Sequence, residues 1–323
     1  MDEFELIRRY FTRPARRAVL GVGDDCALIA PRPGYELALS TDMLVAGRHF
    51  LRDAEPGALG HKTLAVNLSD CAAVGAEPRY ALLAGALPDA NPDWLEAFSR
   101  GLFALADRYG VELIGGDTTR GPLTLCVTIV GEVPAGRALL RSGARPGDTV
   151  WVSGMLGTAA AGLAVLRGGL DLPEAERRQA LDALQRPDPR VELGVALRGI
   201  AASAIDVSDG LVGDLRHIVE RSAVGAEIEL SRLPCAGWLR ARLEPAASRH
   251  FALHCLLAGG DDYELCFTAP PSQATRVLAA GSEAGVAVTP IGHIVEGAAL
   301  AVLDEHGHAL DLSSLRAFDH FGS

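Results

Sequence analysis

Residues 204–215, AIDVSDGLVGDL, contain the pattern that decides the fold class. The apolar run at 204–207 predicts a short strand, and the polar residues after it predict a loop. Leu211, Leu215 and Ile218 then recur on one face of a helix. A strand that opens into a loop and is followed by an amphipathic helix is typical of folds that alternate strands with helices.

The same succession recurs along the rest of the chain. Strands are expected at 36–40, 111–117, 123–133, 148–154, 226–230, 263–269 and 286–292, and helices at 4–11, 57–76, 91–109, 156–168, 173–184 and 190–201. The helix at 91–109 has the clearest boundaries, since Asn91 is a good N-cap, Pro92 suits the first turn and Gly110 ends the helix. The predicted fold class is α/β, in the broad sense that includes α+β.

Two domains are expected rather than one. The chain has 323 residues, which is long for a single hydrophobic core. Residues 136–148, GRALLRSGARPGD, are rich in Gly, Arg and Pro, as a domain junction often is. We therefore predict an N-terminal domain over 1–138 and a C-terminal domain over 139–323.

The composition argues against several classes of function. The net charge is −11, so the chain has no general attraction for nucleic acids or anionic membranes. No apolar run reaches the length of a membrane span, and the charged N-terminal segment does not resemble a signal peptide. The six cysteines form no C-x-x-C pair and lie among apolar residues, which predicts buried free thiols. We expect a cytoplasmic protein with no nucleic-acid or membrane partner.

Aspartate recurs at the end of apolar stretches, beside Gly, Ser or Thr. The segments are GVGDDCALI (21–29), STDML (40–44), NLSDCAAVGAEP (67–78), LIGGDTTRGP (113–122), AIDVSDGLVGDL (204–215) and LAGGDDYELCF (257–267). Carboxylates at strand ends project into the crevices where α/β folds bind ligands. Short carboxylates are hard oxygen ligands that suit Mg²⁺, and the candidates are Asp25, Asp42, Asp70, Asp117, Asp206 and Asp209.

So many converging carboxylates would repel one another without cations. Several Mg²⁺ ions together with a polyphosphate would balance the charge. Phosphoryl transfer needs little covalent help from a protein, because it depends on two anions held in line while positive groups absorb their charge. The acidic segments therefore favour a phosphoryl-transfer site.

For several candidate residues, a purely structural role is an alternative to a role in binding. Asp24 is expected to cap a turn while its neighbour binds a metal, and Asp214 is expected on a solvated helix face. Arg141 is either a nucleotide-phosphate contact or a surface guanidinium. Tyr109 either stacks on a base or packs at a helix end, and His49 either donates to a substrate phosphate or lies in a surface loop.

Taken together, the strings resemble the thiamine-monophosphate kinase family. They are GVGDDCALI, LSTDMLVAGRHF, KTLAVNLSDCAAVGAEP, LIGGDTTRGP, RSGARPGD, SAIDVSDGLVGDL, GGDDYELCF and FDHF, in the family's order and over nearly the whole chain. The resemblance implies transfer of a phosphoryl group from ATP to thiamine monophosphate with several Mg²⁺ ions, the last step of thiamine diphosphate biosynthesis. It also implies the fold of the aminoimidazole ribonucleotide synthetase superfamily. In that fold the N-terminal domains of a homodimer pair into a β-barrel with ATP in the cleft, and the C-terminal domain is an α/β sandwich.

The resemblance further implies roles for individual residues. The implied metal ligands are Asp25, Ser40, Thr41, Asp42, Asp70, Asp117, Asp206 and Asp209, of which Asp42, Asp117 and Asp209 are also assigned to catalysis. The implied ATP contacts are Tyr109, Gly116, Asp117, Arg141 and Ser208, and the implied substrate contacts are His49, Asp261 and Phe318. The family commonly has Glu at the position of Asp261 and Tyr or Trp at that of Phe318. Asp261 keeps the negative charge that would attract the cationic thiamine, but its side chain is one methylene shorter than that of Glu. Phe318 keeps an aromatic face for stacking.

Two other hypotheses remain open at this point. One is a different ATP-using enzyme of the superfamily, such as aminoimidazole ribonucleotide synthetase or selenophosphate synthetase. The latter usually carries a reactive Cys or selenocysteine near its N-terminus, whereas the first cysteine here is Cys26, inside the GDDCALI string. The other is a non-catalytic scaffold that binds divalent metal, against which the unbroken acidic set argues.

Overall fold

The computed structural model describes residues 2–313 and 315 and divides into two compact units. The N-terminal unit comprises the chain up to Cys71 and Ala76–Gly136, and the C-terminal unit comprises Ala72–Gly75 and the chain from Arg137 onward. The third change of unit, between Gly136 and Arg137, falls at the start of the Gly-, Arg- and Pro-rich segment. Each unit combines helices with a β-sheet, which confirms the predicted α/β class.

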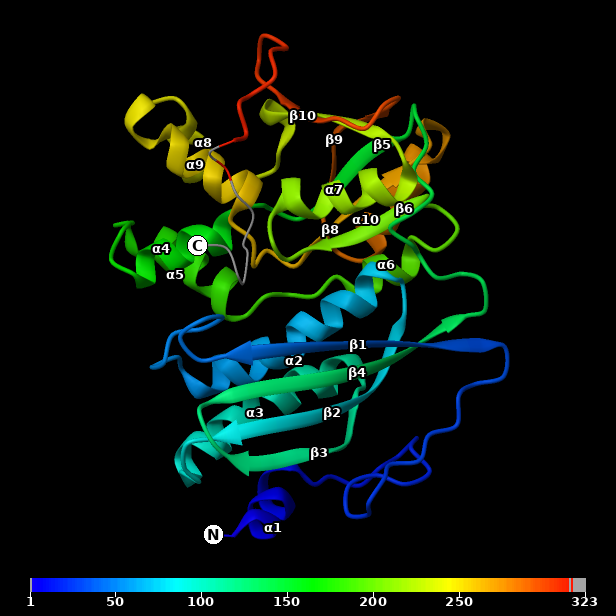
Figure 1. Cartoon of the computed structure of the whole chain (residues 1–323), viewed down its shortest axis with the longest axis vertical. Coiled ribbons are helices and arrows are strands. Elements are labelled where there is room, and N and C mark those ends of the chain that lie inside the picture. The colour runs from blue at the N-terminus through cyan, green and yellow to red at the C-terminus, as the bar shows by residue number, and fades with distance from the viewer. Residues whose placement is uncertain (1, 314, 316–323) are drawn as a thin grey trace. The chain divides into compact units, whose positions relative to one another are not determined.

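The N-terminal unit is built on a four-stranded sheet in the order β1-β4-β2-β3. The strands are β1 (Tyr35–Val45), β2 (Glu77–Leu87), β3 (Glu112–Arg120) and β4 (Thr124–Pro134), and only the β2–β3 pair is parallel. Helices α2 (Pro56–Ala73) and α3 (Pro92–Tyr109) lie on one face of this sheet (Figure 1). The expected boundaries of α3 are confirmed: Asn91 Oδ1 accepts from the N–H groups of Asp93 and Trp94, and Gly110 has φ +64°.

The opposite face of the sheet carries exposed apolar side chains on β1. Leu37 is 37% exposed, Leu39 is 66% exposed and Met43 is 55% exposed. These residues alternate with Ala38, Ser40 and Asp42 because successive side chains of a strand point to opposite faces. Residues 77–87 were not predicted as a strand, yet β2 is an inner strand of the sheet.

The N-terminal segment begins with α1 (Glu3–Leu6) and continues into a π-helical turn at Ile7–Phe11. Leu6, Tyr10 and Phe11 are buried, so the expected amphipathic helix is present. Phe4, which the sequence pattern places on its apolar face, is 75% exposed.

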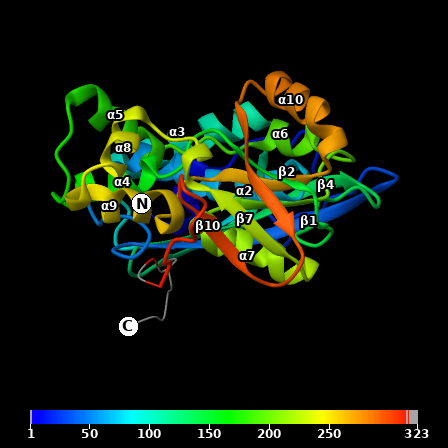
Figure 2. The same cartoon turned by 90° about the horizontal axis from the view of Figure 1, so that it is seen from above.

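The C-terminal unit is built on a six-stranded sheet in the order β10-β7-β9-β5-β8-β6. The strands are β5 (Thr149–Ser153), β6 (Ser203–Val207), β7 (Gly225–Glu229), β8 (Glu264–Ala269), β9 (Val288–Val295) and β10 (Leu300–Leu303). The helices are α4 (Thr158–Leu166), α5 (Glu174–Gln185), α6 (Val191–Ala196), α7 (Leu211–Ser222), α8 (Gly237–Arg240), α9 (Ala246–Ala258) and α10 (Ala274–Glu283). Figure 2 shows α7 and α10 on opposite sides of the sheet, as expected for an α/β sandwich.

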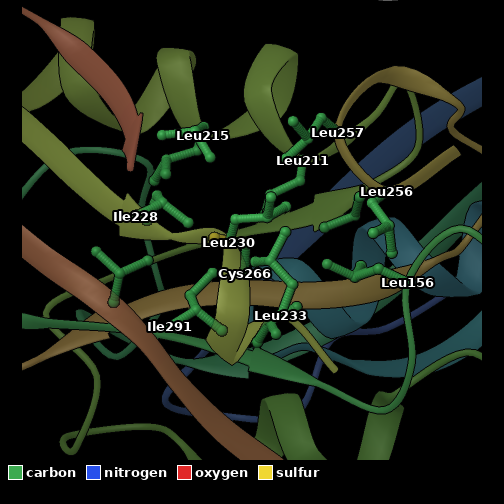
Figure 3. Packing of buried hydrophobic residues seen from close by; sticks show 14 of the residues in the cluster. Leu156, Leu211, Leu215, Ile228, Leu230, Leu233, Leu256, Leu257, Cys266 and Ile291 are labelled. Atoms are coloured by element: carbon green, nitrogen blue, oxygen red, sulfur yellow. The ribbon is translucent and has the colours of Figure 1, made fainter. Parts of the chain in front are cut away.

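The core of this unit lies between the sheet and the helices α7 and α9. Leu211 and Leu215 of α7 and Leu256 of α9 pack with Ile228 and Ile291 of the sheet (Figure 3). All five are at most 1% exposed. Each such side chain contributes about 1.5–3 kcal/mol when it leaves water. This packing fixes α7 directly after β6 and therefore fixes the loop between them.

No helix in the described part of the chain is long and apolar enough to cross a membrane. The six cysteines are free thiols, as predicted. Cys71, Cys255 and Cys266 are buried, as predicted, whereas Cys126 and Cys235 are only half-buried and Cys26 is exposed, so the prediction is wrong for Cys26. The apolar residues after Cys26 do not bury it, because it lies in a surface loop.

Candidate active site

In the N-terminal unit, β1 and α2 bring two of the candidate aspartates together. Ser40 Oγ donates to Asp70 Oδ2 at 2.5 Å, and the backbone N–H of Asp42 donates to Asn67 Oδ1 at 3.1 Å. Asn67 and Asp70 are three residues apart on α2 and therefore share a face of the helix. Burial raises the pKa of the Cys126 thiol, and the Asp42 carboxylate raises it further, which places that carboxylate near β4.

Thr41 lies on the other face of β1. Its Oγ1 lies 2.8 Å from Thr128 Oγ1, in the hydrogen-bonded pair that the register of β1 and β4 sets up. The structure therefore does not bring the Thr41 hydroxyl to the Ser40–Asp70 pair, although all three residues were predicted as metal ligands.

The Asp24–Asp25 loop is closed by backbone hydrogen bonds between Leu20 and Leu28. Asp24 Oδ1 accepts from the N–H of Asp25 at 2.9 Å, which agrees with the expected turn-capping role of Asp24. Both aspartates are exposed, so the Asp25 carboxylate is accessible to a ligand.

Gly116 and Asp117 lie on β3, at the sheet edge opposite β1. Asp117 is exposed and pairs in register with Ala84 of β2. Strands in a sheet lie about 4.8 Å apart, so the three intervals from β1 to β3 amount to about 14 Å. Within one chain, the sheet therefore separates Asp117 from Asp42.

His49 and Tyr109 also lie in the N-terminal unit. His49 Nδ1 accepts from the backbone N–H of Val45 at 2.9 Å, so a neutral ring carries its proton on Nε2 and can donate from there. Tyr109 ends α3 and is half-buried, with the Arg108 guanidinium 5.0 Å from the centroid of its ring.

In the C-terminal unit, three carboxylates gather where β6 meets α7. Asp206 and Asp214 are buried, whereas Asp209 in the loop between the elements is exposed. Asp214 Oδ2 accepts from the N–H groups of Ser208 (3.0 Å), Asp209 (3.1 Å) and Gly210 (3.1 Å). Burial, followed by the charges of Asp206 and Asp209, raises the pKa of Asp214 to about 8, although the N–H donors of Asp209 and Ser208 act in the opposite direction.

The expectation that Asp214 lies on a solvated helix face is therefore wrong. Asp214 is 4% exposed, because the first turn of α7 directs its carboxylate back beneath the loop that precedes the helix. Three N–H groups of that loop lie ahead of the helix, so a buried acceptor satisfies them.

The loop at 259–263 lies against the loop at 208–210. The N–H of Asp261 donates to the C=O of Ser208 at 2.8 Å. Tyr263 Oη donates to Asp261 Oδ1 at 3.1 Å. Asp261 and Tyr263 both have positive φ, +62° and +50°, a conformation that costs non-glycine residues free energy.

The two neighbouring aspartates of this loop have different environments. The Asp262 carboxylate accepts from the N–H of Gly157, at 3.0 and 2.9 Å, directly before α4. Burial raises its pKa well above the usual range of a carboxyl. Asp262 thus supports the start of α4, while Asp261 is the member of the pair next to Ser208.

The structure does not bring Arg141 to Ser208. The C=O of Leu140 accepts from the N–H of Ala204 at 2.9 Å, near the start of β6, whereas Ser208 follows its end. The four residue steps from Ala204 to Ser208 span about 13 Å of extended chain. The Arg141 side chain is exposed, which agrees with the hypothesis that it is a surface guanidinium. Phe318, a predicted substrate contact, lies outside the described residues.

Within residues 2–313 and 315, no three His, Cys, Asp or Glu side chains are grouped closely enough to hold a metal ion by themselves. Mg²⁺ does not require such a group, since it commonly takes one or two carboxylates together with waters and substrate phosphates. The Asp42–Asp70 pair beside Ser40, and the Asp206–Asp209 pair, match that requirement in donor chemistry.

Three residues support these groups in a way that was not predicted: Asn67, Asp214 and Tyr263. The position of Asp214 had a usable signal, because an acidic residue in the first turn of a helix often accepts from N–H groups at or before the helix start. Asn67 and Tyr263 act across contacts between elements, so no local pattern in the sequence indicates them.

Comparison with known proteins defines the class first. Residues 23–133 match the family described as AIR synthase related protein, N-terminal domain, and residues 145–305 match its C-terminal domain. The chain is thus a two-domain protein of the AIR synthase related class.

Individual relatives narrow this class. The thiamine-monophosphate kinase of Escherichia coli (strain K12) is 48% identical over 99% of this chain and 98% of that protein. The crystal structure of thiamine-monophosphate kinase from Stenotrophomonas maltophilia K279a has a TM-score of 0.84 and 44% identity, over 95% of this chain and 96% of that chain. AaThiL complexed with AMPPCP and TMP has a TM-score of 0.79 and 32% identity, over 90% of this chain and 89% of that chain. The chain belongs to the thiamine-monophosphate kinase family.

Proposed function

We propose that the chain transfers the γ-phosphoryl group of ATP to thiamine monophosphate and forms ADP and thiamine diphosphate. The observation that carries this proposal is the 48% identity to the E. coli thiamine-monophosphate kinase over 99% of the chain. The AaThiL relative is complexed with AMPPCP and TMP, which supports the same pair of substrates. We place the reaction in the cytoplasm, where the six thiols would stay reduced.

The proposed reaction is a direct in-line displacement. An oxygen of the thiamine monophosphate phosphate forms a bond to the γ-phosphorus of ATP. The bond from that phosphorus to the β–γ bridging oxygen breaks, and ADP leaves with the electron pair. No protein nucleophile is needed, so the side chains hold the two anions in line and compensate their charge.

Mg²⁺ would be held by oxygen ligands in each unit. In the N-terminal unit the proposed ligands are the hydroxyl of Ser40 and the carboxylates of Asp25, Asp42, Asp70 and Asp117, and in the C-terminal unit those of Asp206 and Asp209. When bound, Mg²⁺ supplies positive charge that offsets the repulsion between phosphates. Among these residues, Asp42, Asp117 and Asp209 are proposed to matter most for turnover.

The remaining assignments concern the two substrates. The proposed ATP contacts are Tyr109, Gly116, Asp117, Arg141 and Ser208. His49, with its proton on Nε2, is proposed to donate to the phosphate of thiamine monophosphate. Asp261 and Phe318 are proposed to face the cationic, aromatic part of the substrate.

We also propose that the protein is a homodimer, paired through the open face of the N-terminal sheet. Leu37, Leu39 and Met43 form an exposed apolar row on β1, at 37%, 66% and 55% exposure. Burial of such a row against a second copy would remove apolar surface from water. Closing two sheets into a barrel would also remove their free edges.

The test is incubation with Mg-ATP and thiamine monophosphate, followed by chromatography. We expect stoichiometric ADP and thiamine diphosphate, and no product in a matched run with unphosphorylated thiamine. ATP consumption with an aminoimidazole precursor but none with thiamine monophosphate would refute the assignment.

A further inference from the structure

The 208–210 loop is held by one side-chain oxygen of the buried residue Asp214. Asp214 Oδ2 accepts from three successive backbone N–H groups, at 3.0, 3.1 and 3.1 Å, while Asp214 itself is 4% exposed. Successive N–H groups that point to one centre make a cavity suited to a negative charge. In this loop the acceptor oxygen comes from the protein, so it fixes the shape of the loop before any ligand arrives.

The same loop is confined from another side by α9. A Cβ on Gly210, which has φ +112°, would lie 2.7 Å from the backbone of Ala258. The loop therefore has one backbone path between the carboxylate of Asp214 and the end of α9. Ser208 and Asp209, the proposed ATP and metal contacts, are presented by this path.

The 259–263 loop is in turn built on the 208–210 loop. The N–H of Asp261 donates to the C=O of Ser208 at 2.8 Å, and the N–H of Tyr263 donates to the C=O of Val207 at 2.8 Å. A Cβ on Gly260 would lie 2.5 Å from the same Ser208 oxygen, so the two backbones are in direct contact. Displacement of Ser208 would therefore displace Asp261 as well.

We propose that Asp214 is a positioning residue that sets both the proposed nucleotide loop and the proposed thiamine loop, although it touches neither substrate. The effect of this role on catalysis rests on the proposed function. Loss of the Asp214 acceptor would leave the N–H groups of Ser208, Asp209 and Gly210 without this partner and would move both loops together. The expected signature is therefore a joint effect on ATP and thiamine monophosphate.

The test compares Asp214→Ala, Asp214→Asn and the matched variant Asp148→Asn. Asp148 is also a buried aspartate of the C-terminal unit, 5% exposed, and accepts one N–H bond, from Arg145 at 2.9 Å. For Asp214→Ala we expect kcat/KM to fall by about 100-fold, the effect of a small misplacement of reacting groups. The KM values for both substrates should rise with it. Asp214→Asn keeps an acceptor oxygen and should recover part of this loss, and Asp148→Asn should behave as wild type.

Hydrogen–deuterium exchange provides a readout that does not depend on turnover. In Asp214→Ala, the amides of 208–210 and of 259–263 should exchange faster together, while the amides of β5 and β9 keep their protection. If Asp214→Ala does not fold, Asp214→Asn should still show the joint increase. Unchanged exchange in 259–263, or wild-type kinetics in both variants, would overturn the proposal.

Failure of the Asp214 proposal can be distinguished from failure of the proposed function. If the wild-type chain forms no thiamine diphosphate, the assigned reaction fails. The exchange measurement then still decides whether Asp214 positions both loops.

Discussion

At the scale of single residues, the proposed metal role of Asp42 can be tested by an isosteric change. Asp42→Asn keeps the size of the side chain but removes a charge beside Asp70. We expect kcat to fall by at least about 100-fold, because a group that stabilises developing charge typically contributes that much. The measurement is steady-state formation of thiamine diphosphate, with circular dichroism to confirm the fold.

The matched control is Asp107→Asn, which also removes one negative charge from the N-terminal unit. Asp107 lies on α3, where its side chain is 68% exposed and pairs with Arg13 at 2.9 Å. Surface pairs of this kind contribute at most about 1 kcal/mol to stability, so turnover should be unchanged. Normal turnover by Asp42→Asn would exclude the metal role of that residue.

Glu112 gives a prediction about pH. Burial alone would raise its pKa, but the backbone N–H groups of Arg17, Ala18 and Arg16 outweigh burial and leave the pKa lowered. A lowered folded-state pKa contributes stability above the unfolded-state pKa of about 4.3 and loses it as the pH falls through the folded-state value.

Glu112→Gln should therefore lower the free energy of unfolding by about 1–3 kcal/mol at pH 7, with a smaller difference below about pH 4. Urea denaturation at both pH values measures this difference. Glu96→Gln, at an exposed pair with Arg100 on α3, should change stability by less than about 0.5 kcal/mol. A difference between Glu112→Gln and wild type that is equal at both pH values would contradict the assignment.

Single residues also show where sequence-based reasoning stops. Asp24 was expected to cap its turn, and it does, because its partner is the next residue along the chain. Asp214 was placed on a solvated face, because its burial depends on how α7 packs on the sheet. The contact of Ser40 with Asp70 joins a strand to a helix thirty residues later, which no local pattern specifies.

At the scale of elements, an ion pair joins three parts of the C-terminal unit. Glu264 of β8 accepts from Arg190, ahead of α6, at 2.6 and 2.7 Å, and from Ser153 Oγ of β5 at 2.6 Å. The side chains of Arg190 and Glu264 are 20% and 6% exposed. This pair is mostly removed from water, so loss of one partner leaves a buried charge.

Arg190→Leu should lower the free energy of unfolding by about 3–5 kcal/mol, as is typical when a buried pair is broken on one side. The double variant Arg190→Leu with Glu264→Leu should be less destabilised than Arg190→Leu alone, since no buried charge remains. Denaturant titrations of the wild type, Arg190→Leu, Glu264→Leu and the double variant give the comparison. A double variant with the summed loss of both single variants would refute this account.

Elements with local boundary signals were predicted well. α3 begins after Asn91 and ends at Gly110, because capping residues act on the backbone next to them. β2 was missed, because it begins with Glu77-Pro78 and its run of Ala, Leu and Gly shows neither alternation nor β-branched residues. Its place inside the sheet comes from pairing with β3 and β4, which is a long-range property.

At the scale of the whole molecule, the proposed homodimer depends on the open face of the N-terminal sheet. Leu39→Arg places a charge in the apolar row of β1, where Leu39 is 66% exposed. A buried unpaired charge opposes association, so we expect this variant to be monomeric. Light scattering after size exclusion measures the mass.

The control for the dimer is Leu278→Arg, at another exposed leucine, on α10 of the C-terminal unit, which is 52% exposed. That variant should keep the mass of the wild-type assembly. A monomeric wild type, or a dimeric Leu39→Arg, would contradict pairing through β1.

The central claim is that acidic side chains in each unit hold divalent metal for phosphoryl transfer from ATP to thiamine monophosphate. The most direct measurement is a crystal structure with Mn²⁺, a non-hydrolysable ATP analogue and thiamine monophosphate, with the anomalous signal locating the metal. We predict peaks within about 2.5 Å of carboxylate oxygens of Asp42, Asp70, Asp206 and Asp209. Metal bound only by phosphates and water, with none of these four carboxylates in contact, would contradict the account.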